Sequence, residues 1–103
     1  MARWSQTHAE HVHIATISEQ IPIAGIARIT LHDGSTIEGV LRNVHIGNNA
    51  GHGGWKYRGE LEIETKERTR WTIDYLDIKS ASNAWTTALA DEYEKLGLIS
   101  IQR

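Results

Sequence analysis

The sequence predicts a small, mainly β fold in which five short strands form a barrel and a C-terminal α-helix follows. Two patterns carry this prediction. From Gly25 onward, apolar and polar residues alternate in short segments separated by turn residues, as they do in strands that bury one face. A stripe of apolar residues at helical spacing then follows near the C-terminus.

The first hairpin is predicted at Asp33 and Gly34. The apolar residues of 27–31 alternate with polar ones, and glycine accepts the positive φ that tight hairpin turns demand. In the second strand, the parity of the apolar positions changes at Arg42 and Asn43. We therefore expect a β-bulge or sharp bend at this point, and a bent strand is what a small barrel needs.

The remaining strands are predicted from the same alternation. The glycine-rich segment GNNAGHGG (47–54) reads as a mobile loop, and WKYRGELEIET (55–65) as a strand with its aromatic and aliphatic side chains facing inward. Residues 69–73 are the expected return strand. One helical turn is expected at 74–76, and a last short strand at 77–80.

The whole chain, residues 1–103, is predicted to form one domain with an extension at each end of the barrel. Residues up to about 20 form an N-terminal extension in which VHIATI has strand character, as does the tail LISIQR. A helix over about 82–96, capped by Ser82 or Asn83 and ended by Gly97, presents an apolar stripe. The stripe and the tail supply the residues expected at an oligomer or partner interface, which are Trp85, Leu89, Leu96, Ile99 and Ile101.

Composition restricts the classes of function. The chain of 103 residues holds 11 Lys and Arg against 13 Asp and Glu, so its net charge of −2 creates no global attraction for nucleic acid or anionic membrane. The absence of cysteine excludes disulfides and thiolate metal sites. No apolar run is long enough for a signal peptide or a membrane span. We expect a soluble, cytoplasmic protein with no membrane partner.

The hairpin region resembles the first motif of the Sm-like family of small β-barrels. The residues that carry the resemblance are Leu31, Gly34, Ile37, Gly39, Leu41, Val44 and Asn49. The resemblance implies an Sm-like five-stranded barrel that self-associates through its edge strands, with Asn49 in contact with an RNA base. Four features depart from the family. His45 replaces its usual aspartate, and the loop 47–54 is longer and richer in glycine. RWTIDYLDIKSA lacks the arginine-glycine pair of the second motif, and the clear helix follows the barrel instead of preceding it.

The candidate nucleic-acid site lies in the region 45–58. If the resemblance extends to function, Asn49 is the base-contacting amide, and His45 or His52 offers stacking and hydrogen bonds. Trp55, Lys56 and Arg58 supply the mix of rings and cations that suits RNA or single-stranded DNA. The alternative is structural: asparagines in glycine-rich loops serve turn conformations, and the cations form cross-strand ion pairs with equally numerous acidic neighbours.

Chemistry beyond binding has little support in the sequence. On a strand, His11 and His13 would share one face, with His8 or Glu10 as further metal ligands, but solvated histidines are the ordinary interpretation. No catalytic motif is present, so we expect no enzyme, no cofactor and no resident metal. Two main hypotheses remain. The first is an oligomeric module that binds RNA or single-stranded DNA, and the second is a protein-interaction scaffold that uses the helix and the edge strands. A third interpretation, the metal site at the N-terminal histidines, predicts zinc or nickel retained after purification without an affinity tag.

Overall fold

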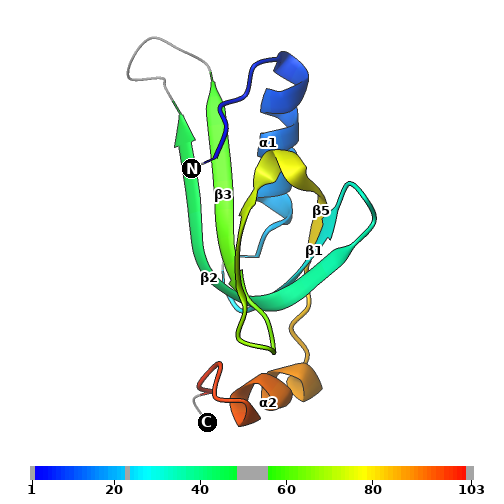
Figure 1. Ribbon diagram of the computed structural model, residues 1–103, viewed down its shortest axis with the longest axis vertical. Coiled ribbons are helices and arrows are strands. Elements are labelled where there is room, and N and C mark those ends of the chain that lie inside the picture. The colour runs from blue at the N-terminus through cyan, green and yellow to red at the C-terminus, as the bar shows by residue number, and fades with distance from the viewer. Residues whose placement is uncertain (1, 23, 49–55, 102–103) are drawn as a thin grey trace.

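A computed structural model describes residues 2–22, 24–48 and 56–101 of the chain (Figure 1). An N-terminal helix precedes five strands, and a short helix follows them. The elements are α1 (His8–Gln20), β1 (Ile26–Leu31), β2 (Thr36–Asn48), β3 (Tyr57–Glu64), β4 (Arg70–Asp74), the 3₁₀ turn η2 (Tyr75–Asp77), β5 (Ile78–Asn83) and α2 (Thr87–Lys95). In these described ranges, no helix is long and apolar enough to span a membrane.

The five strands form one antiparallel sheet in the order β4-β3-β2-β1-β5. The sheet is strongly bent, and α1 lies across one end of it while α2 lies at the other end (Figure 1). The predicted mainly β class with five strands is confirmed. The two edges of the sheet are β4 and β5, and closure of the sheet into a barrel remains a prediction.

The first hairpin forms where the sequence predicts it. The Leu31 N–H donates to Ser35 O at 2.9 Å, and the Ser35 N–H donates to the Asp33 carboxylate at 2.9 Å. Gly34 has φ of 88°, in the left-handed region that favours glycine. The Asp33-Gly34 turn is therefore confirmed, together with its physical reason.

The bend in β2 is also confirmed. The pairing of β2 with β3 shifts register between Leu41 and Asn43, at the predicted bulge. Just before this shift, a Cβ placed on Gly39 would lie 2.4 Å from the Glu64 carbonyl oxygen. Only glycine lets β2 pass this close to β3, so the bend depends on a missing side chain.

The N-terminal strand expected at VHIATI is wrong, because this segment is the middle of helix α1. The Thr7 hydroxyl accepts a hydrogen bond from the Glu10 N–H at 3.1 Å and caps the helix. Ile14 and Ile17 bury their side chains in the main core. The helix forms despite several β-branched residues because its cap and this narrow apolar stripe outweigh their weak strand preference.

The core consists of two clusters on opposite faces of the sheet. The first lies on the concave face under α1 and includes Ile29, Leu61 and Tyr75. The second cluster includes Ile26 and, on α2, Tyr93. Successive side chains of a strand point to opposite faces, so Ile26 lies on the other face from Ala27, which belongs to the first cluster. Each helix therefore contributes side chains to one of the two clusters.

Helix α2 is shorter than predicted. Ser82 and Asn83 belong to β5, and the Asn83 side chain instead accepts the Trp85 N–H at 2.8 Å in a turn. Thr86 is the true cap, since its hydroxyl accepts the Leu89 N–H at 3.0 Å. The predicted end at Gly97 is confirmed by its φ of 77°.

The tail does not continue as a strand over residues 98–101, which corrects the expectation for LISIQR. Leu98 is buried in the second cluster, and its carbonyl accepts a hydrogen bond from Arg42 at 2.7 Å. The tail is thus fixed to the sheet by packing and by a β2 side chain instead of by strand pairing.

Candidate functional site

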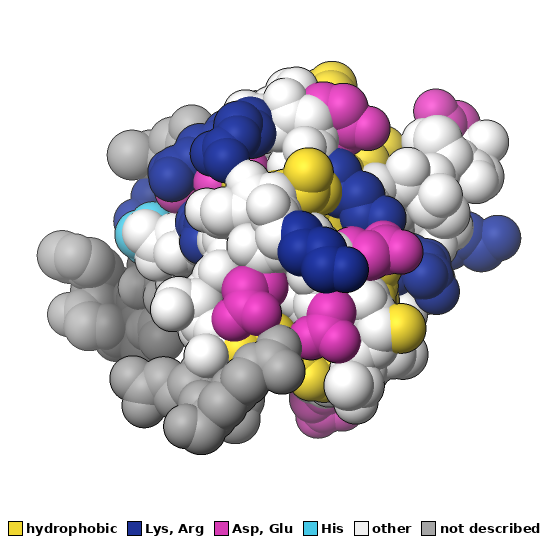
Figure 2. Space-filling model, turned by 90° about the horizontal axis from the view of Figure 1, so that it is seen from below, with side chains coloured by type: hydrophobic (Ala, Val, Ile, Leu, Met, Phe, Trp, Pro, Cys, Tyr) yellow, Lys and Arg dark blue, Asp and Glu magenta, His cyan; other side chains and the backbone are white. Residues whose placement is uncertain are grey.

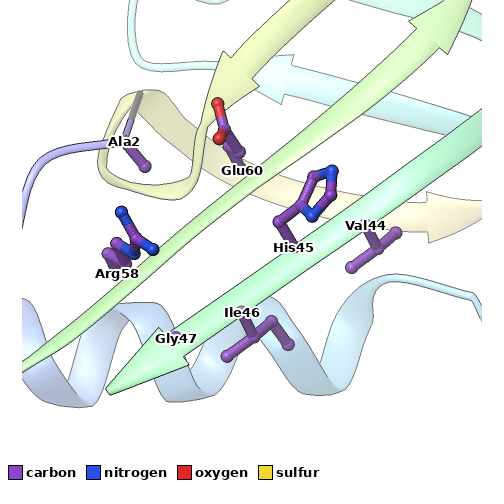
Figure 3. Close-up of a pocket in the computed structure, with 7 residues that line it drawn as sticks. All are labelled: Ala2, Val44, His45, Ile46, Gly47, Arg58 and Glu60. Carbon is purple, nitrogen blue, oxygen red and sulfur yellow. The ribbon is translucent and has the colours of Figure 1, made fainter. Parts of the chain in front are cut away.

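A hollow of about 370 Å³ lies where β2 and β3 continue beyond the rest of the sheet (Figure 3). His45 pairs directly with Glu60 across the two strands, and Gly47 pairs with Arg58. Directly opposed residues share one face of a sheet, so the imidazole, the carboxylate and the guanidinium lie on the same face. The residues lining the hollow are Ala2, Val44, His45, Ile46, Gly47, Arg58 and Glu60.

Arg58 is held in place from two sides. Its guanidinium carbon lies 5.0 Å from the centroid of the Trp4 ring, a cation–π contact. Toward β2, a Cβ on Gly47 would lie 2.9 Å from Arg58 Nε, so the side chain crosses the strand where glycine leaves room. A guanidinium fixed in this way is prepared to bind an anion with little loss of side-chain entropy.

The N-terminal segment before α1 positions Trp4. The Ser5 N–H donates to Tyr57 O at 2.7 Å, and the Tyr57 N–H donates to Ser5 Oγ at 2.9 Å. Arg3 reaches Asp74 at 2.9 Å and Asp77 at 2.6 Å. Both hydrogen bonds raise the pKa of Arg3. The segment is therefore hydrogen-bonded to Tyr57 of β3, which lies beyond the residues that pair with β4.

Sequence reasoning missed this role of Trp4. The available signal was a lone tryptophan in the polar stretch MARWSQT, which nothing in the local pattern explained. Its partner Arg58 is fifty-four positions away in sequence, and no local periodicity connects the two.

The predicted nucleic-acid residues are only partly described. Asn49, His52 and Trp55 lie outside the described residues, as does most of the loop predicted at 47–54. Arg58 lies in the hollow, and the neighbouring Lys56 bonds to the Gln6 side chain at 3.3 Å. The structure therefore brings Arg58 together with His45, Glu60 and Trp4.

Most other cations in the described part of the chain are engaged in ion pairs. Seen from the α2 end, Lys and Arg side chains are interspersed with Asp and Glu (Figure 2). The pKa of Lys66 is raised chiefly by its hydrogen bond to Glu92. Three of these pairs, Arg28 with Glu38, Arg42 with Glu64, and Lys66 with Glu92, have N–O distances of 2.7 to 2.8 Å. The described residues on this face form no continuous basic track.

The residues predicted at a partner interface separate into two groups. Trp85 is 46% exposed and Leu96 is 43% exposed. Leu89 and Ile99 instead pack against the second core cluster, and the Ile101 N–H bonds to Glu94 at 3.1 Å. Only Trp85 and Leu96 therefore present large apolar surface, because α2 turns Leu89 toward the sheet.

The edge of β4 offers unpaired backbone groups. The Thr65 N–H donates to Thr69 O at 3.0 Å, at the start of the β3–β4 ladder. Bonded and non-bonded pairs alternate in an antiparallel ladder, so the backbone of Trp71 faces β3 and that of Thr72 faces outward. On β5, by contrast, the outward Ala81 N–H donates to the Gln20 side chain at 2.9 Å.

The histidines do not form the N-terminal cluster that a strand would give. Because residues two apart on a helix point in different directions, His11 and His13 separate. The His11 ring lies 4.2 Å from the ring of Tyr57, while His13 Nε2 is 2.7 Å from Ile78 O. Among residues 2–22, 24–48 and 56–101, no group of three or more His, Cys, Asp or Glu side chains is arranged to hold a metal ion.

Comparison of the chain with models of known protein families, with curated proteins and with solved structures gives no match in any of the three.

Proposed function

We propose that the protein is a non-enzymatic, self-associating Sm-like module that binds RNA or single-stranded DNA on the face formed by β2 and β3. The fixed position of Arg58 between the Trp4 ring and Gly47 is the observation that carries the proposal. This arrangement brings a cation and an aromatic ring together on the face that carries His45, and the resemblance assigns the base contact to Asn49, four residues further along the sequence. Cations beside rings are the common means by which single strands are bound without a duplex groove.

The arrangement of elements supports the Sm-like resemblance. A helix precedes β1, which removes the departure that the sequence indicated, and β2 bends at a glycine and a bulge. The edge strands of the sheet are β4 and β5. Pairing β4 of one copy with β5 of the next would satisfy the amides that point away from the sheet. In that assembly, the partner strand would replace Gln20 at the Ala81 amide.

A salt titration of oligonucleotide affinity tests the binding face. Each phosphate contact to a single strand contributes about −0.7 to the slope of log affinity against log salt. Arg58→Ala should weaken binding about tenfold and make this slope shallower by about 0.7, because one charge-assisted contact is worth about 1.4 kcal/mol or more. Arg70→Ala, an exposed cation on β4, is the matched control and should leave the slope unchanged.

A second variant tests the position of Arg58 without changing charge. Gly47→Ala puts a methyl group where Arg58 Nε lies, so the guanidinium has to move away from its place on Trp4. We expect weaker binding with the same fold. Wild-type affinity in both Arg58→Ala and Gly47→Ala, or an affinity that does not change with salt, would remove nucleic acid as the ligand of this face.

The second candidate function is a protein-interaction scaffold, which the exposed Trp85 and Leu96 favour. These two side chains flank α2, whose larger apolar side chains, Leu89 and Tyr93, pack in the second core cluster. Trp85→Ala combined with Leu96→Ala should abolish partner capture or assembly and leave oligonucleotide affinity unchanged. Leu89 is unsuitable for this test, because it packs inside the molecule and its replacement would loosen α2.

A further inference from the structure

We propose that His13 and His32 together form a binding site for a divalent transition-metal ion such as Zn²⁺. His13 lies on α1, and His32 lies in the turn that follows β1. Their ring centroids are 5.7 Å apart, and the ring planes are tilted by 34°. These two histidines are nineteen positions apart in sequence, so only the fold brings them together.

The hydrogen bonds of the two rings determine which nitrogen is available to a metal. His13 Nε2 is 2.7 Å from Ile78 O, and His32 Nε2 is 3.0 Å from Leu76 O. A carbonyl oxygen only accepts, so in each neutral ring Nε2 carries the proton and Nδ1 carries the lone pair. Metal-binding histidines have this arrangement, in which the second nitrogen donates to a backbone carbonyl and fixes the ring.

The distance between the rings suits a shared ion. With Zn–N bonds of about 2.0–2.1 Å and a near-tetrahedral angle, two imidazoles on one ion have centroids about 5–6 Å apart. The described part of the chain supplies no third ligand at this point. Water or an external ligand would complete the coordination, so the site would hold its ion reversibly instead of as a structural zinc.

The place of the pair in the fold gives the ion a structural effect. The carbonyls of Leu76 and Ile78 flank the junction of η2 and β5, so an ion held by both rings would link α1 to the first hairpin through this junction. An ion that binds only the folded state raises the unfolding temperature. A metal-dependent increase in stability is therefore the expected signature.

The neighbouring pair His8 and His11 provides a matched control. Its ring centroids are 6.2 Å apart, but the rings are stacked with only 9° between their planes. Imidazole lone pairs lie in the ring plane, so two stacked rings direct them parallel to each other and not toward an ion between the faces. His8→Ala combined with His11→Ala should leave Zn²⁺ binding intact.

The test is a Zn²⁺ titration of the full chain without an affinity tag, followed by calorimetry and by the thermal unfolding midpoint. His13→Gln and His32→Gln are the informative variants, because glutamine keeps a nitrogen donor for the carbonyl but has no ring lone pair. Each should weaken Zn²⁺ binding at least tenfold, the smallest effect usual for loss of a metal-orienting group. Each should also abolish the Zn²⁺-induced rise in unfolding temperature, and Mg²⁺ should produce none in any variant.

Nitrogen-15 spectra of the imidazoles provide a second measurement that does not depend on stability. In the metal-free protein, His13 and His32 should be Nε2-protonated, and Zn²⁺ should shift their Nδ1 resonances ahead of those of the other histidines. Unchanged Zn²⁺ affinity in both glutamine variants, or loss of binding in the His8/His11 double variant alone, would overturn the proposal. So would the opposite tautomer on both rings.

Discussion

Two buried tyrosines show how differently the same hydroxyl group can act in this protein. Tyr75 is fully buried in the first core cluster, and its hydroxyl has no hydrogen-bond partner within the described part of the chain. Tyr93 is equally buried, but its hydroxyl donates to the Glu38 carboxylate at 3.3 Å. Among the described residues, the second hydroxyl therefore has a charged acceptor and the first has none.

This contrast predicts opposite effects of one conservative substitution. Tyr75→Phe should raise the free energy of unfolding by about 1 kcal/mol, because it removes an unsatisfied polar group. Tyr93→Phe should lower it by about 1 kcal/mol, because it removes the hydrogen bond to Glu38 Oε1 and leaves Arg28, on Oε2, as the donor to this carboxylate. Urea denaturation of both variants measures the difference. A loss of stability in Tyr75→Phe would show that its hydroxyl has a partner.

Burial of Tyr75 also predicts how stability changes in alkali. Burial raises the pKa of this phenol from 10.0 to about 12. The unfolded chain then ionises first, so the stability is fully present below pH 10 and decreases as pH rises from 10 through 12. Denaturation midpoints measured across this range should fall less steeply in Tyr75→Phe than in wild type. Parallel profiles would contradict the assignment.

At the scale of single elements, the sequence predicted what depends on local chemistry. The turn at Gly34 and the end of α2 at Gly97 each follow from the backbone preference of one glycine, and the bulge after Leu41 follows from the changed parity of the apolar positions in β2. The predicted start of α2 is too early, because Asn83 is as good a cap as Thr86. Asn83 belongs to strand β5, so the helix begins only after Thr86. Tertiary pairing overrode a local signal there.

Helix α1 had a signal that the strand interpretation overlooked. Thr7 and Glu10 are spaced as in a capping box, and the Glu10 side chain accepts the Gln6 N–H at 2.7 Å. The β-branched residues of VHIATI concealed it. The candidate site was harder to predict, because Trp4 and His32 meet their partners only through the folded sheet.

The cap of α1 makes a direct prediction for the element. Thr7→Ala removes the hydroxyl that accepts the Glu10 N–H and should cost about 1 kcal/mol of stability. Amide hydrogen exchange should accelerate in residues 8–20 more than in the strands, because the helix end frays first. Uniform acceleration across the molecule would mean that α1 and the sheet open only together. Thr16→Ala, within the same helix, is the control.

At the scale of the whole molecule, the edge strands β4 and β5 of the bent sheet are the feature on which the proposed assembly depends. Neither edge is long, but the Thr72 amide on β4 faces outward and is ready to pair with another strand. Proline at this position should leave the β3–β4 ladder intact, because no ladder hydrogen bond uses that amide. It should therefore separate the copies without unfolding them.

The native mass, measured by light scattering across a range of concentrations, is the most direct test of this account. For the wild-type chain we predict the mass of an oligomer, which is a constant multiple, two or more, of 11.6 kDa. For Thr72→Pro we predict a folded monomer of 11.6 kDa. A wild-type mass of 11.6 kDa at every concentration, or a Thr72→Pro variant that assembles as the wild type does, would contradict association through the β4 edge.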